Sequence, residues 1–152
     1  MKKFLVLGLI VTALIALSSC TPSNSSGQST AVPAKGEELQ LPAVEGLPDY
    51  AYRSAGALQG YQIAVMEKDL LAKLPCYCGC GQDKQFQNLR DCFLNEQGQF
   101  NSHGANCEIC QEEAVDAMTW KKQGISTKGI RDRIDKAYEG RGEPTDTPPV
   151  EG

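Results

Sequence analysis

The 152-residue sequence lacks several features that would point to a common class of protein. It has 15 basic against 19 acidic residues and a net charge of −4, so it lacks the basic surface with which proteins bind nucleic acids. It also lacks a long apolar run beyond its first sixteen residues, and its mean hydropathy is −0.34. We therefore expect no nucleic-acid partner and exclude a membrane protein with several spans.

The motifs of common enzyme classes are absent too. The sequence has a single histidine, and it contains no Ser-His-Asp pattern, no HExxH motif and no glycine-rich phosphate loop. Neither the alternating pattern of β-strands nor a repeat of roughly 20–50 residues is visible. We therefore expect an all-α domain and do not expect an enzyme.

The N-terminal segment has the organisation of a bacterial lipoprotein signal. Two lysines precede an apolar stretch of 13 residues, Phe4 to Ala16, which is shorter than a transmembrane helix requires. Leu17-Ser-Ser-Cys20 follows and matches the lipobox, in which small residues precede a cysteine that receives a lipid. We predict a signal peptide over residues 1–19 and a lipid anchor, palmitate included, on Cys20; the alternative is an ordinary secretory signal.

Composition divides the rest of the chain into three parts. Residues 20–47 begin with TPSNSSGQSTAVPA after the cysteine, a stretch with too little apolar surface to fold, and we predict a flexible linker there. Residues 48–140 are predicted to form a small Cys-rich helical domain. Residues 141–152 are polar and rich in proline, and we predict a disordered tail.

The domain is predicted to contain about four helices, because apolar residues recur at helical spacing in four stretches. These stretches are 50–72, 84–94, 105–123 and a last helix that starts at Ser126 or Thr127 and includes Tyr138. Residues 95–103 read as a loop. Four such helices carry few large apolar side chains, and small domains with a thin core often depend on disulfides or a metal.

Cysteines are the most informative feature, because six of the seven lie between residues 76 and 110. Gly79 and Gly81 in the first run allow a tight backbone that brings sulfur atoms together. His103, the only histidine, lies four residues before the last pair. The candidate ligands form a C-x-C-x-C run, a single cysteine, the histidine and a C-x-x-C pair: Cys76, Cys78 and Cys80; Cys92; His103; and Cys107 and Cys110.

Three kinds of chemistry fit this pattern. Thiolates are soft ligands that suit Cu(I) and Zn(II), and seven groups exceed the four that one zinc ion needs, which favours a site where one thiolate serves two Cu(I) ions. Disulfides are the first alternative, because an exported protein meets an oxidising environment. Thiol–disulfide exchange by the Cys107-x-x-Cys110 pair is the second, although the βαβ pattern of thioredoxin-like proteins is missing.

Three segments together resemble the PCYCGC-motif lipoproteins, which are small anchored proteins of Gram-positive, Bacillus-like bacteria. The segments are LPCYCGCG at 74–81, LRDCF at 89–93 and HGANCEIC at 103–110, and the resemblance covers roughly residues 47–139. It implies a lipoprotein with a compact helical domain and functional cysteines, and it names no substrate. A weaker resemblance to the helical, cysteine-bearing domains of cytochrome c maturation supports the redox alternative.

We therefore predict a lipid-anchored protein on the extracytoplasmic face of the cell membrane, with other envelope proteins as candidate partners. It binds Cu(I) or Zn(II) through its thiol-rich site for buffering, delivery or structure. Two charged pairs receive simple structural interpretations. Arg90-Asp91 is interpreted as a solvated helix pair, and Glu112-Glu113 as acidic residues that the dipole at the start of a helix favours.

Overall fold

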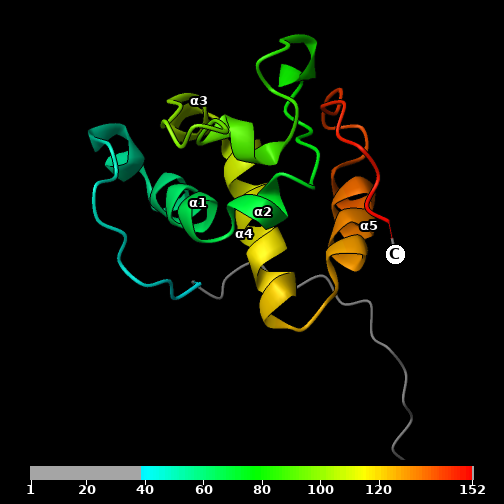
Figure 1. The fold of residues 1–152 in the computed structure, drawn as a ribbon, viewed down its shortest axis with the longest axis horizontal. Helices are drawn as coiled ribbons and strands as arrows, with labels where there is room; N and C mark the ends of the chain where they lie inside the picture. The colour runs from blue at the N-terminus through cyan, green and yellow to red at the C-terminus, as the bar shows by residue number, and fades with distance from the viewer. Residues whose placement is uncertain (1–38, 152) are drawn as a thin grey trace, which may run out of the picture. The chain divides into compact units, whose positions relative to one another are not determined.

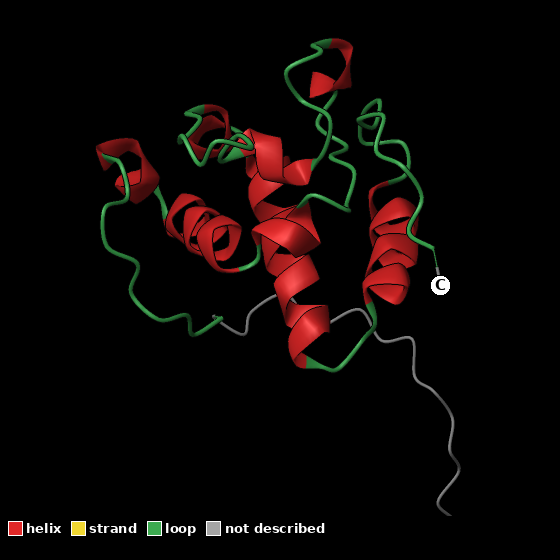
Figure 2. Ribbon diagram, in the orientation of Figure 1, coloured by secondary structure: helices red, strands yellow, loops and turns green. Residues whose placement is uncertain are grey.

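The computed structural model describes residues 39–151. The predicted signal peptide, the lipid site at Cys20 and most of the predicted linker lie outside these residues. The described part contains five α-helices, three short 3-10 helices and no β-strand, apart from one isolated bridge between Leu94 and Phe100 (Figure 2). This confirms the predicted all-α class. Among the described residues, no helix has the length and apolar character needed to cross a membrane.

The helix predicted over 50–72 is three shorter elements. They are η1 (Asp49–Arg53), α1 (Ala55–Met66) and α2 (Lys68–Leu71). Ser54 separates the first two because its backbone is extended and its side chain caps α1 by accepting the N–H of Ala57. A capped helix start is a fixed boundary, because the hydroxyl satisfies an N–H that has no partner within the helix.

The prediction of a helix over residues 84–94 is wrong. Only η3 (Leu89–Cys92) forms there, because Asp91 binds its surroundings through its side chain. Its carboxylate accepts the backbone N–H of Gln87 and the guanidinium of Arg90, and such local bonds compete with helix formation. Asp91 is buried, so the interpretation of Arg90-Asp91 as a solvated helix pair is also wrong.

The helix predicted over 105–123 is interrupted near its start, whereas the last helix forms as predicted. α3 (His103–Asn106) and α4 (Glu108–Lys122) are separated by Cys107, whose backbone is extended. α5 (Thr127–Tyr138) begins after Ser126, and the hydroxyl of Ser126 accepts the N–H of Gly129 at 3.2 Å. The last helix was predictable because its cap and its apolar stripe both lie within the helix itself.

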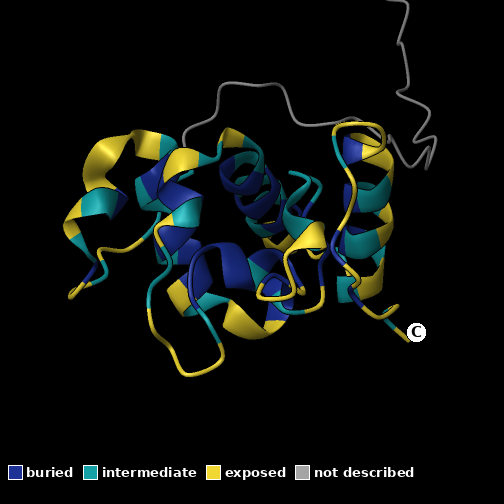
Figure 3. Ribbon diagram, turned by 90° about the horizontal axis from the view of Figure 1, so that it is seen from above, coloured by how far each residue is buried: buried dark blue, intermediate teal, exposed yellow. Residues whose placement is uncertain are grey.

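α4 is the central element of the domain. It contacts α1 on one side and α5 on the other, and Figure 1 shows it between these two helices. Buried and exposed stretches alternate along the helices (Figure 3), so each turns one face to the common core. The largest buried apolar side chains of the core belong to Trp120, Tyr61, Phe93, Ile63, Leu71, Leu74, Leu89, Ile130 and Ile134.

The folded part extends further in the N-terminal direction than the predicted boundary at residue 48. Leu47 is buried, and Leu39, Leu41 and Val44 pack against the core. The side chain of Gln59 in α1 also donates a hydrogen bond to the carbonyl of Leu39 at 3.0 Å. The last part of the predicted linker, residues 39–47, is therefore packed on the domain.

The C-terminal segment, residues 141–151, is also packed on the domain, so the predicted disordered tail is wrong. Thr145 and Thr147 are buried, and Figure 1 shows the segment running beside α5. The N–H of Thr145 donates to the carbonyl of Cys76 at 3.0 Å. Arg131 of α5 donates to the carbonyls of Thr147 at 3.3 Å and Pro148 at 3.0 Å. Composition could not show this, because backbone groups make most of these bonds.

Candidate metal centre

The structure brings all six predicted cysteine ligands and the histidine together, from five parts of the chain. Cys76 and Cys78 lie in the loop before η2 (Cys80–Gln82), and Cys80 is the first residue of η2. η3 ends on Cys92, and α3 begins with His103. Cys107 occupies the N-cap position of α4, and Cys110 lies in its first turn. All six cysteines have free thiols. Segments that are separate in the sequence therefore meet at one end of α4.

Three overlapping sets of four residues could each hold a metal ion, because their ligand atoms all lie within 4.8 Å of one another. We call these sets groups 1, 2 and 3. Every predicted ligand belongs to at least one group, and Cys78 belongs to all three. Group 1 is Cys76, Cys78, Cys92 and Cys110; group 2 is Cys78, His103, Cys107 and Cys110; group 3 is Cys78, Cys80, Cys92 and His103.

Two contacts define the spacing at the centre. The sulfur atoms of Cys76 and Cys110 lie 3.4 Å apart, and the sulfur of Cys78 lies 3.5 Å from Nε2 of His103. In a tetrahedral zinc site, the usual bond lengths place two sulfurs about 3.8 Å apart and a sulfur and a nitrogen about 3.5 Å apart. These two pairs of ligand atoms are therefore spaced almost as a bound tetrahedral ion requires, and the other pairs within each group lie no more than 4.8 Å apart.

Burial divides the seven side chains into a floor and a rim. The floor consists of Cys76, Cys92 and Cys110, which are completely buried. The rim consists of four half-buried residues: Cys78, Cys80, His103 and Cys107. A metal ion would thus enter past the rim, and the floor would shield it from solvent on the other side.

Glycines shape the loop that carries three of the cysteines. Gly79 adopts a left-handed conformation with φ of 82°, which turns the chain between Cys78 and Cys80 at little cost for a residue without Cβ. At Gly81, a Cβ would approach the carbonyl oxygen of Pro144 to 2.6 Å. The C-terminal segment therefore lies directly against this loop, as close as the absence of a side chain permits.

Thr145 holds the first cysteine of the loop by both of its backbone groups. The N–H of Cys76 donates to Oγ1 of Thr145 at 2.9 Å, and the N–H of Thr145 donates to the carbonyl of Cys76 at 3.0 Å. The hydroxyls of Thr145 and Thr147 are 2.9 Å apart, and Thr147 donates to the carbonyl of Gln87. The buried C-terminal segment therefore positions a predicted ligand, a role that its sequence did not reveal.

Contacts with neighbouring residues fix the position of His103. Its backbone N–H donates to Oδ1 of Asn101 at 3.0 Å, and the amide of Asn101 donates to the carbonyl of Asp91 at 3.1 Å. The imidazole packs on the ring of Phe86, with 4.7 Å between centroids. These contacts attach α3 to the turn that carries Cys92 and aim the imidazole at Cys78.

The rim groups carry charges of opposite sign. The pKa of the Cys78 thiol lies well below its usual range, chiefly because the thiol of Cys107 donates a hydrogen bond to it. Hydrogen bonding with Cys76 lowers the pKa of Cys80 to about 6. Hydrogen bonding to Cys107, then to Cys78, raises the pKa of His103 to about 11. These shifts favour the thiolate form of Cys78 and Cys80, which is the metal-binding form of cysteine.

Glu113 is a residue beside the centre that the sequence reasoning missed. It is completely buried, and its Oε1 accepts the backbone N–H of Tyr77 at 2.8 Å. Its Oε2 has no hydrogen-bond partner among the described residues, and burial raises its pKa to about 8. Glu113 lies beyond the first turn of α4 and is buried, so the interpretation of this residue as one that the dipole at the helix start favours is wrong. Its position, three residues after Cys110, was the available signal, because it places both residues on one face of α4.

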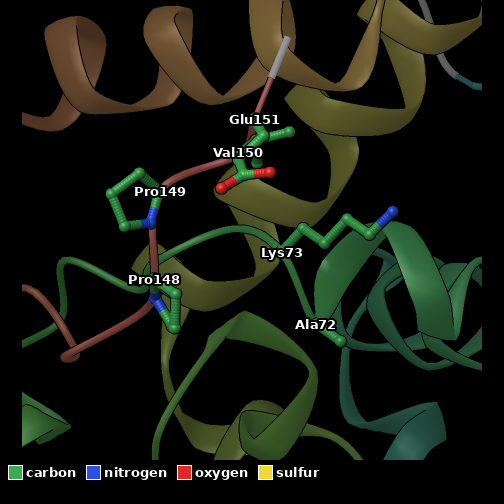
Figure 4. A pocket seen from close by; sticks show the side chains of 6 residues that line it. All are labelled: Ala72, Lys73, Pro148, Pro149, Val150 and Glu151. Atoms are coloured by element: carbon green, nitrogen blue, oxygen red, sulfur yellow. The ribbon is translucent and has the colours of Figure 1, made fainter.

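Two pockets lie beside the C-terminal segment, and neither is lined by a predicted ligand. One is formed by Ala72 and Lys73 with the last residues, from Pro148 to Glu151 (Figure 4). The other lies between α5 and Pro144, with Tyr77 at its edge. Both are bordered by proline and charged side chains. The chemistry-bearing residues of the described chain therefore gather at the centre and not in a pocket.

Comparison with known proteins gives a single result. The model of a family described as "Protein of unknown function with PCYCGC motif" matches residues 8–150. No curated protein and no solved structure matches the chain. The matched range covers nearly the whole chain, including all seven predicted ligands and Cys20.

Proposed function

The chain belongs to the family of PCYCGC-motif proteins, and from its N-terminal sequence and its thiol-rich centre we propose that it is a membrane-anchored lipoprotein that binds a soft metal ion outside the cytoplasm. The metal is copper(I) or zinc(II), and the ligands come from the seven residues of the centre. The protein buffers the metal or delivers it to an envelope partner.

One observation carries the metal-binding proposal. Six thiols and one imidazole from five parts of the chain converge so that three sets of four ligand atoms lie within 4.8 Å. Sulfur and imidazole nitrogen are the ligands that copper(I) and zinc(II) prefer in proteins, whereas calcium and magnesium prefer oxygen. No carboxylate belongs to any of the three groups, so the donor set favours the soft metals.

The arrangement supports metal binding better than thiol–disulfide exchange. An exchange site needs one reactive cysteine beside one partner. The sequence predicted the Cys107-x-x-Cys110 pair for this role, and the half-buried Cys80 with its pKa of about 6 would be a second candidate nucleophile. Cys78, however, belongs to three ligand groups at once, so no pair of cysteines stands apart from the others. Among residues 39–151 there is also no strand that could form a thioredoxin-like sheet.

The anchor rests on the sequence. Two lysines, the apolar stretch and the lipobox cysteine Cys20 have the order that lipid attachment requires. The family match begins at residue 8 and runs across Cys20, which is what a family of anchored proteins would give. A diacylglyceryl group supplies two chains, and two chains are enough for stable anchoring.

The test uses the full-length chain, purified from membranes in detergent without reductant. Elemental analysis and native mass spectrometry are expected to give bound copper or zinc in stoichiometric amount, with six thiols open to alkylation once the metal is removed. The matched control is Cys20→Ser, which changes the seventh cysteine. It should keep the metal and leave the membrane fraction. A metal-free chain lighter than the reduced chain by about 6 Da would instead mean three disulfides and would contradict the proposal.

A further inference from the structure

The three ligand groups overlap in a regular way. Groups 1 and 2 share Cys78 and Cys110, and groups 1 and 3 share Cys78 and Cys92. Groups 2 and 3 share Cys78 and His103. Each group also has one member of its own: Cys76 in group 1, Cys107 in group 2 and Cys80 in group 3. Every pair of groups is thus joined by two ligands, one of which is always Cys78.

We propose that the centre holds a thiolate-bridged cluster of three copper(I) ions, one in each group, with the sulfur of Cys78 as their common ligand. This inference rests on the proposed function, because it requires that the centre bind a soft metal. Cys110 bridges the ions of groups 1 and 2, and Cys92 bridges those of groups 1 and 3. The residue that belongs to each group alone is the terminal ligand of its ion.

Because the groups overlap, three ions cannot each have a separate set of four ligands. Three separate four-ligand sites would need twelve ligands, whereas the groups contain seven residues in total. A thiolate sulfur has several lone pairs and can bind more than one metal, and the three residues that the inference makes bridging, Cys78, Cys92 and Cys110, are all cysteines. Each thiol that becomes a ligand releases its proton to solvent as the metal binds. No oxidation or reduction is involved.

His103 should make the number of bound ions differ between copper(I) and zinc(II). Nε2 of an imidazole has one lone pair and binds one ion, so groups 2 and 3 cannot both use it. Without it, group 2 still has the sulfurs of Cys78, Cys107 and Cys110, and group 3 those of Cys78, Cys80 and Cys92. Three sulfurs suffice for trigonal copper(I), whereas structural zinc is tetrahedral and needs four ligands. The centre should therefore hold three copper(I) ions but only two zinc ions.

Burial makes the three ions unequal. The terminal ligand of group 1 is Cys76, which is completely buried and held by Thr145 through two hydrogen bonds. The terminal ligands of groups 2 and 3 are Cys107 and Cys80, which are half-buried members of the rim. A competing ligand can approach these two sulfurs from solvent. Two of the three copper ions should therefore leave quickly and the third slowly.

The experiment titrates the full-length protein, reduced and free of metal, with copper(I) or zinc(II) under anaerobic conditions and counts the bound ions by native mass spectrometry. The wild-type chain should bind three copper(I) or two zinc(II) ions. A strong copper(I) chelator such as bicinchoninate should then remove two copper ions at least tenfold faster than the third.

Two variants distinguish the loss of the ligand shared by all three groups from the loss of ligands that belong to fewer groups. Cys78→Ser combined with His103→Ala leaves only one set of three ligands, the sulfurs of Cys76, Cys92 and Cys110, so copper should fall from three ions to one. The double variant Cys80→Ser with His103→Ala also removes two side chains but should lose only the ion of group 3, leaving two. Equal copper counts in these two variants would overturn the cluster.

A measurement on the unaltered chain covers the case in which a variant does not fold. X-ray absorption of the copper-loaded wild-type protein should show a sulfur shell and short copper–copper scattering. Binding of one copper ion per chain without that scattering overturns the cluster but leaves the proposed function standing. A wild-type chain that binds neither metal overturns both.

Discussion

Nε2 of His103 lies 3.5 Å from the sulfur of Cys78, although 25 residues separate them in the sequence. The contact joins the first residue of α3 to the loop before η2. It places the only histidine of the chain against the only cysteine that belongs to all three ligand groups.

Replacement of this histidine should affect zinc more than copper. In His103→Ala, groups 2 and 3 keep three sulfurs each, which satisfies copper(I) but leaves zinc one ligand short. We expect the affinity for the second zinc ion to fall by more than about tenfold, since the loss of a supporting partner alone costs at least that much, while three copper(I) ions still bind.

Competition titrations with a zinc chelator measure this effect. Ser102→Ala is the matched control, because the neighbouring side chain makes no hydrogen bond to the centre. An unchanged second zinc affinity in His103→Ala would show that the imidazole is not a ligand.

The hydroxyl of Thr145 should stabilise the domain through Cys76. Thr145→Val removes the acceptor of the buried Cys76 N–H, and an unpaired buried donor costs about 1–3 kcal/mol. We expect a loss of this size in the free energy of unfolding, measured by urea denaturation of the metal-free reduced protein. Thr145→Ser keeps the hydroxyl and should recover most of the loss. If the valine and serine variants are equally stable, the hydrogen bond does not matter.

Glu113 should make the metal-free protein less stable as the pH rises. Its folded pKa of about 8 lies above its ordinary value of 4.5 because the side chain is buried. Between these two values the folded state keeps a proton that the unfolded state has lost, so the free energy of unfolding falls with rising pH by up to about 1.4 kcal/mol per unit. The stabilising contribution is fully present below pH 4.5 and lost by about pH 8.

Glu113→Gln should remove this part of the pH dependence, because an amide does not titrate. Denaturant unfolding of the reduced, metal-free protein at pH 5 and pH 8 measures it, and the difference between the two pH values should shrink relative to wild type. Glu112→Gln is the control, since that side chain is partly exposed. A variant at residue 113 with the wild-type difference would show that the buried carboxyl does not control it.

Chelation should destabilise the purified protein, whereas reduction should not. Metal ligands that exist only in the folded state couple metal binding to folding, so a chelator of copper and zinc should lower the melting temperature by several degrees. A phosphine reductant that binds these metals weakly should leave it unchanged. Scanning calorimetry of the full-length chain measures both, and the opposite pattern would indicate disulfides.

The sequence predicted an element correctly where the interactions that stabilise that element lie within a few residues of one another. The cap at Ser126 and the apolar stripe of α5 predicted that helix correctly. The helix predicted over 84–94 failed because Asp91, which its spacing left in solvent, is buried and binds the backbone of Gln87. The prediction of a disordered tail failed because it rested on polar composition, whereas hydrogen bonds to Cys76 and Arg131 hold the segment in place.

The candidate ligands could be named from the sequence alone, because six thiols and the only imidazole lie within 35 residues, although that spacing left metal binding, disulfides and thiol exchange open. The tertiary structure decided what spacing cannot: which ligands meet, that Cys78 serves every group, and that three cysteines form a buried floor. The reason is physical. Side-chain chemistry belongs to each residue, whereas the distances between ligands depend on how α4, α3 and the C-terminal segment pack against the loop.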